Sequence, residues 1–201
     1  MRLLPILWIA VLPILAGCGI VQSVQPLSSP RAAVADKRLA GLWQEKEGKD
    51  GRAYYYFSFA ADGHGNLMIF GTDPKSGLGE FKYDFFVTPA GKEGYLNLSH
   101  LVTSGTDSGA IFKPDGDNYF FAKYRFNWLG QLECRTVMGN TFGKAVDSHK
   151  LRGRADYDKQ HDTYDDIYLT DSSQHILDFI NSSKSKDVLG YETKLTWVGG
   201  P

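Results

Sequence analysis

The sequence contains little cysteine and almost no excess of charge. Two cysteines among 201 residues cannot form a disulfide-dense scaffold or a four-cysteine zinc site. Lys and Arg total 22 and Asp and Glu total 23, whereas a nucleic-acid-binding surface needs a basic excess or a basic stripe. The N-terminal apolar run, residues 3–14, is shorter than the about 20 residues that a membrane-spanning helix needs. The composition therefore predicts no nucleic-acid partner.

The motifs of the common enzyme and metal-binding classes are also missing. There is no P-loop and no dinucleotide-binding glycine pattern, and residues 104–109 lack the spacing of a nucleophile elbow. No two of the five histidines have the i, i+4 spacing of a helical metal pair. The acidic segment 156–166 would need a glycine and a glutamate to form a calcium loop, where His161 and Ile167 stand. The sequence predicts a non-enzymatic protein with no metal, cofactor or catalytic residue.

The first residues have the pattern of an export signal. Arg2 precedes the apolar run, and small residues follow it, as in a secretory signal peptide. The tetrapeptide Leu15-Ala16-Gly17-Cys18 resembles the lipobox of bacterial lipoproteins. The alternative is an ordinary secreted protein with a chance cysteine.

The resemblance to bacterial lipoproteins implies a modification and an address. It implies cleavage of a signal peptide, residues 1–17, transfer of diacylglycerol to the Cys18 sulfur, and acylation of the new amine by a fatty acid such as palmitate. Several acyl chains together hold a protein stably on a membrane. The expected location is the bacterial cell envelope. Gly19 stands where an aspartate tends to retain such proteins at the inner membrane, so we expect the outer membrane.

The residues after the lipobox divide into a linker and a body. Residues 18–38 are rich in Ser, Gln, Pro, Ala and Val without a clear period, so we expect a lipidated cysteine followed by a flexible tether. Residues 39–201 form the expected folded domain. With Cys18 modified, Cys134 has no partner within the chain, and it is either a buried small apolar residue or free to pair with another molecule.

Alternating apolar and polar residues dominate the body and predict β-strands. The alternation puts Phe120, Ala122, Tyr124, Phe126 and Trp128 on one strand face, with Phe121 as the apolar exception on the other face. Turn-forming residues separate successive runs. The sequence therefore predicts a mainly β protein, an antiparallel meander that closes into a barrel of about eight strands. The predicted strands lie at 53–59, 66–70, 81–87, 119–128, 131–138, 166–169 and 191–198.

Two short helices are expected near the C-terminus. Phe142, Ala145, Val146 and His149 have the i, i+3, i+4, i+7 spacing of one helix face. The second helix follows Asp171, which with Gln174 resembles a capping box. Its apolar residues are Ile176, Leu177, Phe179 and Ile180.

Gly41-Leu42-Trp43, at the start of the first strand of the expected domain, resembles the Gly-x-Trp opening of the lipocalins and related calycin barrels. The resemblance implies that Trp43 seals the closed end of the barrel and that the interior holds an apolar ligand. The Thr-Asp-Tyr loop motif of that family is missing. Lys194 is the candidate for the basic residue that covers the tryptophan.

Two functions remain open at this point. The first is a membrane-anchored binding module that takes an apolar or amphipathic small molecule through the barrel mouth. The second is a structural or interaction lipoprotein with a filled barrel that contacts an envelope protein. The aromatic run 54–57 together with Phe59 fits either interpretation, because it can line a cavity or fill a core. The sequence assigns no ligand-binding residue.

Overall fold

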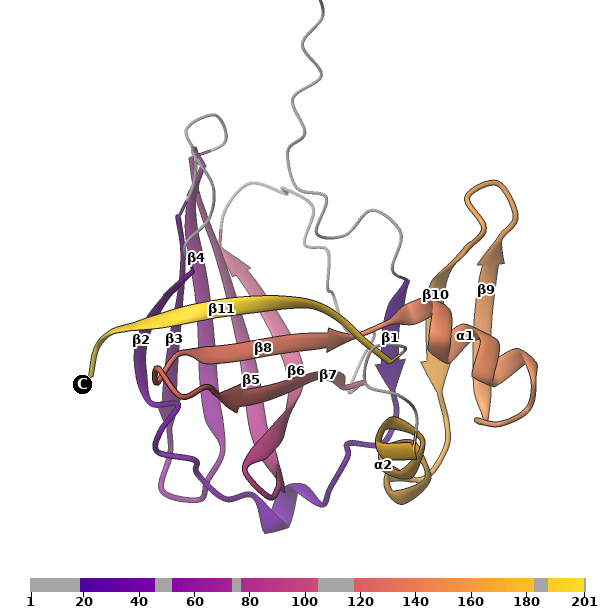
Figure 1. Cartoon of the computed structure of the whole chain (residues 1–201), viewed down its shortest axis with the longest axis horizontal. Coiled ribbons are helices and arrows are strands. Elements are labelled where there is room, and N and C mark those ends of the chain that lie inside the picture. Colours follow the sequence, from indigo (N-terminus) through magenta and orange to yellow (C-terminus); the bar gives the residue numbers. More distant parts are fainter. Residues whose placement is uncertain (1–18, 46–51, 74–76, 105–117, 183–187, 201) are drawn as a thin grey trace, which may run out of the picture.

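The computed structural model describes residues 19–45, 52–73, 77–104, 118–182 and 188–200, and Figure 1 shows the arrangement of the elements. The strands are β1 (Ile20–Ser23), β2 (Gly41–Glu45), β3 (Arg52–Phe59), β4 (Gly65–Asp73), β5 (Gly77–Ala90), β6 (Glu93–Ser104), β7 (Phe120–Phe126), β8 (Leu132–Val137), β9 (Gly153–Asp158), β10 (Thr163–Leu169) and β11 (Leu189–Gly199). The helices are the 3-10 turn η1 (Pro30–Ala32), α1 (Gly139–Asp147) and α2 (Ser173–Ser182).

Eight antiparallel strands form a closed barrel, in the order β11-β2-β3-β4-β5-β6-β7-β8. The barrel closes where β11 pairs with β2, with Trp197 opposite Trp43. The predicted fold class is confirmed: a mainly β chain with an eight-stranded barrel and two helices near the C-terminus. The alternation of apolar and polar residues is the cause, because successive side chains of a strand point to opposite faces of the barrel wall.

One end of the barrel is sealed by the segment that leads into β2. We call the end where β2 begins the closed end. Leu39 is fully buried there, and the indole N–H of Trp43 donates to the Leu39 carbonyl oxygen at 2.7 Å. Tyr124 donates to Asp36 at 2.9 Å, and Arg38 stacks over the Phe126 ring. This segment therefore covers the barrel end that contains Trp43.

The expected partner of Trp43, Lys194, does not cover it. Lys194 lies on the outer face of β11, where its ammonium group pairs with Glu192 at 3.1 Å and with Glu133 at 3.7 Å. Its neighbour Leu195 points inward and is fully buried. Because adjacent strand residues alternate, a lysine next to an inward leucine must face the solvent.

The chain leaves the barrel between β8 and β11 to build a second, smaller unit. The excursion contains α1, β9, β10 and α2, and β1 joins it to form a three-stranded sheet in the order β1-β10-β9. An apolar cluster packs between this unit and the outside of the barrel wall. Phe121 of β7 and Tyr95 of β6 belong to it, which explains the apolar residue on the otherwise polar face of β7.

The expected flexible tether is wrong for residues 20–38. Residues 20–23 pair in parallel with β10, and Val21, Gln22 and Ser23 are buried. The N–H of Leu27 donates to the side chain of Asn97 at 2.7 Å, and this buried amide also donates to Thr88 at 2.9 Å. Long-range pairing with β10 and a buried amide on β6 supply contacts that the composition of the segment does not reveal.

Both helices are where the sequence predicts them, with differences at their ends. Phe142, Ala145 and Val146 are buried on α1 as expected, but His149 lies beyond the helix with a left-handed φ of 55°. Gly143 lies inside α1, where a Cβ would come within 2.2 Å of the Tyr164 ring, so the glycine permits close contact between α1 and β10. Among the described residues no helix is long and apolar enough to cross a membrane.

The cap of α2 lies one residue later than predicted. The hydroxyl of Ser172 accepts the backbone N–H of His175 at 3.3 Å, and this contact caps the helix. The predicted cap, Asp171, is 1% exposed. Its carboxylate accepts the backbone N–H groups of Arg152 and Ser172, each at 2.9 Å, and contacts the imidazole of His175 at 2.8 Å. Asp171 therefore joins the start of α2 to the segment before β9.

The tight hairpin predicted at residues 129–130 joins β7 to β8. The Gly130 N–H donates to the Asn127 carbonyl oxygen at 3.0 Å, and Gly130 has a φ of 75°, which favours glycine. Trp128 belongs to this hairpin tip and is 91% exposed. The prediction that Trp128 shares the inward face of β7 is therefore wrong, because the strand ends at Phe126.

Candidate functional site

The burial of the inward side chains differs between the two ends of the barrel. We call the end where β2 ends and β3 begins the mouth; β8 ends and β11 begins at this same end. In the half next to the closed end, most inward side chains are buried to 7% exposure or less; they are Trp43, Phe57, Leu67, Phe85, Val87, Leu96, Ala122, Tyr124, Leu132 and Leu195.

The half next to the mouth is lined by inward side chains that are half-buried. Tyr55, Ile69, Phe81, Leu98 and Cys134 pack against the barrel core, and each keeps partial exposure. Phe59 and Phe126 are also half-buried, but they stand at the rim of the closed end. The mouth half thus combines an apolar lining with access to solvent, the combination that small-molecule sites use.

One polar pair lies within this lining. Glu45 is two residues from Trp43 on β2 and therefore shares its inward face. The Tyr55 hydroxyl donates to Oε2 of Glu45 at 2.8 Å. A carboxylate inside an apolar lining prefers a ligand group that donates hydrogen bonds or carries positive charge. Glu45 is not among the residues predicted from the sequence; its position two residues after Trp43 on the same strand is the signal that reveals it.

Cys134 lies on the inner wall beside this pair. It is opposite Thr193 of β11 and Tyr124 of β7 in the barrel register. Burial raises the pKa of the Cys134 thiol to about 12, and the nearby charge of Glu45 acts in the same direction. Burial raises the pKa of Tyr83, also inward, to about 12. Both groups stay neutral at physiological pH, so the lining gains no charge from them.

We expect the Cys134 thiol of the native protein to react slowly with a maleimide at pH 8. The reagent needs the thiolate, and the raised pKa leaves very little of it. The rate measured in denaturant gives the reference for an exposed thiol. Equal rates in the native and denatured protein would contradict an inward Cys134.

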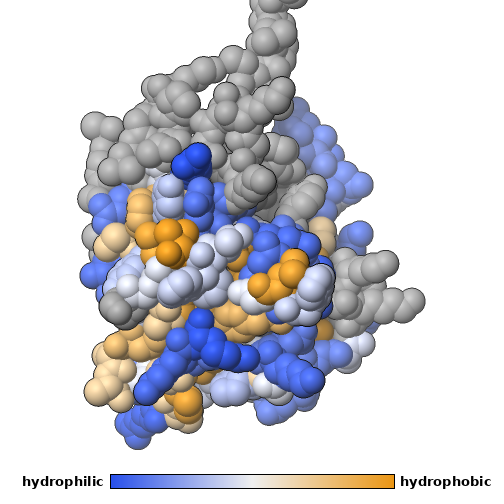
Figure 2. All heavy atoms as spheres, turned by 60° about the vertical axis from the view of Figure 1, so that its left-hand side comes forward, coloured by the Kyte–Doolittle hydropathy of each residue, from blue (hydrophilic) through white to orange (hydrophobic). Residues whose placement is uncertain are grey.

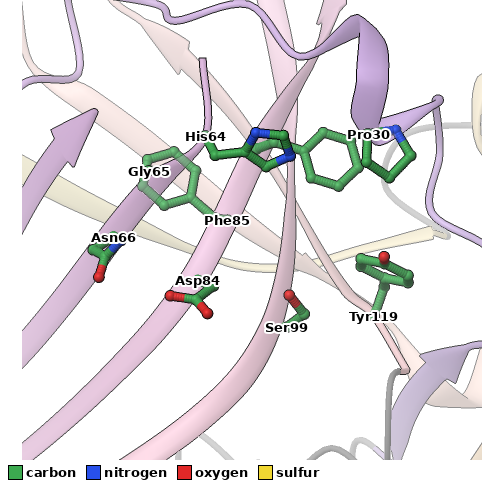
Figure 3. A pocket seen from close by; sticks show the side chains of 9 residues that line it. Pro30, His64, Gly65, Asn66, Asp84, Phe85, Ser99 and Tyr119 are labelled. Carbon is green, nitrogen blue, oxygen red and sulfur yellow. The ribbon is translucent and has the colours of Figure 1, made fainter. Parts of the chain in front are cut away.

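A separate pocket lies outside the barrel wall. Its volume is about 200 Å³, and Figure 3 shows its lining side chains between the outer face of β4–β6 and the segment that carries η1. Pro30, Phe86 and Tyr119 supply apolar walls, and His64, Asn66, Asp84 and Ser99 supply polar groups. This volume is smaller than the few hundred Å³ of most small-molecule sites.

The polar residues of this outer pocket do not form an evident catalytic arrangement. The His64 ring packs near Phe86, with 5.7 Å between ring centroids. Its Nδ1 lies 3.4 Å from Oδ2 of Asp62 and has no hydrogen-bond partner among the described residues. His64 is therefore not linked through this atom to Asp84 or Ser99. The pocket has room for a small polar group, and its described side chains indicate no reaction.

The remaining candidates of the sequence analysis are dispersed. Cys18 lies outside the described residues. The acidic segment forms part of β9 and β10 and the turn between them, where Asp158 contacts the His161 imidazole at 2.5 Å. Hydrogen bonds from His161 and from the Gln160 N–H lower the pKa of Asp158. No group of three or more His, Cys, Asp or Glu side chains in the described part of the chain is arranged to hold a metal ion.

Comparison of the chain with protein-family models, with curated proteins and with solved structures finds no match.

Proposed function

We propose that this protein is a lipoprotein of the bacterial outer membrane, anchored through Cys18, whose barrel binds an apolar or amphipathic small molecule in its mouth half. The observation that carries the binding proposal is the change in burial along the interior. Most inward residues of the closed-end half are buried, whereas Ile69, Phe81 and Leu98 are apolar, inward and half-buried. A barrel that served only as a filled scaffold would bury these side chains as fully as their neighbours.

We expect Ile69→Trp to weaken binding of a dansylated fatty acid by about tenfold or more, which corresponds to 1.4 kcal/mol. The larger side chain would occupy the interior space that the acyl chain needs. The measurement is a fluorescence titration of the Cys18→Ser protein, so that the protein stays soluble and its own acyl chains do not compete.

The matched control is Met68→Trp. Met68 is the adjacent residue on β4, points to the outer face and is also half-buried. It should bind the probe as the parent does, and both variants should keep the melting temperature of the parent within a few degrees. Equal binding by the Ile69 variant and the parent would rule out the interior site. So would the absence of binding both to fatty acids of any chain length and to an acyl lipid with a hydrogen-bond-donating headgroup.

Cys18→Ser should abolish membrane attachment. The hydroxyl cannot accept the diacylglycerol as the thiol does, and without several acyl chains the protein has no stable anchor. The expected result in the native host is loss of acyl labelling and transfer of the protein from the detergent phase to the aqueous phase. Unchanged labelling of the variant would place the lipid elsewhere. Separation of the inner and outer membranes of cells that express the parent protein tests the proposed location at the outer membrane.

Exposed apolar side chains favour a second candidate, contact with an envelope protein. Trp128 and Leu129 occupy the β7–β8 hairpin tip, and Trp197 and Val198 lie near the end of β11. The two places are neighbours, because Gln131 of the hairpin contacts Thr196 at 3.5 Å. Figure 2 shows hydrophobic residues on this side of the molecule as separate small patches among hydrophilic ones. A large continuous patch would favour a protein partner more strongly, so we place ligand binding first.

A further inference from the structure

The residue that follows Cys18 is fixed tightly to the folded body. A Cβ on Gly19 would lie 1.7 Å from the Tyr164 carbonyl oxygen, and a Cβ on Gly139 would lie 2.3 Å from the Gly19 carbonyl oxygen. Gly19 therefore lies wedged between β10 and the first residue of α1. From the next residue, Ile20, the chain pairs with β10. The lipid-bearing residue is thus one Cα–Cα step, about 3.8 Å, from a rigid part of the protein.

Gly19 also lies at the mouth end of the barrel. Val137, the last residue of β8, is opposite Leu189, the first residue of β11. The next residue, Met138, donates its N–H to Val188 at 2.8 Å, and Gly139 then contacts Gly19. In Figure 1 the N-terminal end of β1 and the mouth ends of β3–β6 point to the same side of the molecule, away from η1 and the closed end.

We infer that the mouth of the barrel faces the lipid leaflet that holds Cys18, and that the ligand is an acyl amphiphile that enters the barrel from this leaflet. This inference rests on the proposed function, both the anchor at Cys18 and the interior site. It adds an orientation and a source of ligand. The lipid anchor acts as a positioning device that presents one end of the barrel to the membrane.

The short connection between Cys18 and Gly19 lets the lipid anchor fix the orientation of the folded body. A flexible linker of about 20 residues would have a root-mean-square span of roughly 25 Å and would let the body rotate freely. A single peptide unit allows no such freedom, so the side of the body from which β1 emerges must stay near the headgroups. The closed end, with Trp43 and the β5–β6 turn, then faces away from the membrane.

The lining indicates which amphiphile fits. Ile69, Phe81 and Leu98 offer apolar contact for an acyl chain. Glu45 is the last residue of β2, so its carboxylate lies nearer the mouth than Trp43 does. A chain that enters tail first would leave its headgroup near Glu45 and Tyr55, where an ammonium or hydroxyl group can donate to the carboxylate. The favoured ligand class is therefore an acyl lipid with a donor headgroup, for example lysophosphatidylethanolamine.

The orientation can be measured with the full lipidated protein reconstituted in vesicles. A fluorophore is attached through a clickable unnatural amino acid at position 52 or at position 92, which leaves both cysteines untouched. Arg52 is the first residue of β3 at the mouth, Lys92 lies in the β5–β6 turn at the closed end, and both are exposed cations. With spin-labelled headgroups in the vesicle, we expect strong quenching of the fluorophore at position 52 and little quenching of the fluorophore at position 92.

A linker variant provides the matched control. A Gly-Ser segment of about 20 residues inserted between Cys18 and Gly19 keeps the lipid but removes the fixed connection. The difference in quenching between positions 52 and 92 should disappear in this variant. Equal quenching at the two positions in the parent, or stronger quenching at position 92, would overturn the inference.

The source of the ligand is tested with the same vesicles. Lysophosphatidylethanolamine that carries a photoreactive diazirine at its chain end is added to the bilayer, and adducts are mapped by mass spectrometry. We expect adducts on inward residues that lie deeper in the barrel than Glu45, about tenfold fewer adducts with Ile69→Trp, and no change with Met68→Trp.

The outcomes separate the two proposals. If the soluble Cys18→Ser protein binds the lysolipid but the vesicle experiment gives no interior adducts, the orientation and source are wrong and the binding function stands. If neither form binds a lysolipid or a fatty acid, the binding function itself is wrong. If the parent carries no lipid at Cys18, the inference is overturned with the anchor.

Discussion

Trp43→Ala should lower the free energy of unfolding by about 3–5 kcal/mol, the usual result of truncating a buried aromatic residue. Trp43 is 3% exposed, its N–H donates to Leu39, and its ring packs at 5.9 Å from Phe126. Truncation removes these contacts and leaves a cavity under the segment that closes the barrel. For a chain of this size, each kcal/mol corresponds to about 2–4 °C in melting temperature, so the loss should exceed about 6 °C in a thermal melt.

The control is Trp197→Ala, the same change directly across the strand pair. Trp197 is opposite Trp43 in the register but is 53% exposed, so its truncation should cost much less. Fatty-acid affinity of Trp43→Ala, measured below its melting temperature, should stay near the parent value. A variant that melts like the parent but loses binding would move Trp43 from the sealed end to the ligand site.

Asp171→Ala should lower the free energy of unfolding by about 1–3 kcal/mol, because it leaves two partly buried backbone N–H groups without their acceptor. Burial opposes ionisation of this carboxyl group, but hydrogen bonds from the Arg152 N–H, His175 and the Ser172 N–H outweigh it and lower the pKa of Asp171 to about 2. The pKa in the unfolded chain is higher, near 3.8. The stabilisation from Asp171 is therefore complete above about pH 4 and is lost as the pH falls towards 2.

Asp171→Asn isolates the contribution of the charge. The amide has the size of the carboxylate but does not titrate, so the stability difference between parent and variant should shrink as the pH falls from 4 to 2. Comparing the two proteins cancels the titration of the other carboxylates. A difference that stays the same down to pH 2 would show that the charge of Asp171 contributes nothing.

The barrel could be predicted because the patterns that specify its strands and turns lie within short stretches of the sequence. In β5 and β7 the period of two is visible in the sequence itself, and glycine-rich turns mark where strands reverse. Inward and outward faces follow from the same phase, as Leu195 and Lys194 illustrate. The alternation does not show where a strand ends. Trp128 continues the alternation in the sequence, but the chain has already turned at Asn127.

The small sheet could not be predicted because its strands are stabilised by residues that lie far apart in the sequence. Ile20–Ser23 is too short and too polar to identify as a strand, and it is stabilised by Ile167 and Leu169, which lie far away in the sequence. The cap of α2 shows the same limit on a smaller scale. Asp171 and Ser172 are both good capping residues, and the backbone N–H of Arg152, nineteen positions away, engages the first of them.

The candidate binding site was predicted at the level of the barrel and no further. Which inward residues are half-buried depends on where β2, β3 and β5 lie relative to one another around the barrel. Glu45 illustrates this: its inward phase is fixed by Trp43, but its contact with Tyr55 requires the pairing of two strands. The position of Gly19 at the mouth end likewise follows from its contacts with Tyr164 and Gly139.

The connection between β8 and β11 has a consequence for how the protein is made. The barrel closes only when β11 reaches β2, and the residues that meet, Trp43 and Trp197, are near opposite ends of the chain. Contacts between such distant residues form slowly. While α1, β9, β10 and α2 are still emerging, β2 and β8 expose unpaired edges that invite aggregation. A chain that is exported before it folds would therefore need a holding chaperone until β11 pairs with β2 and β8.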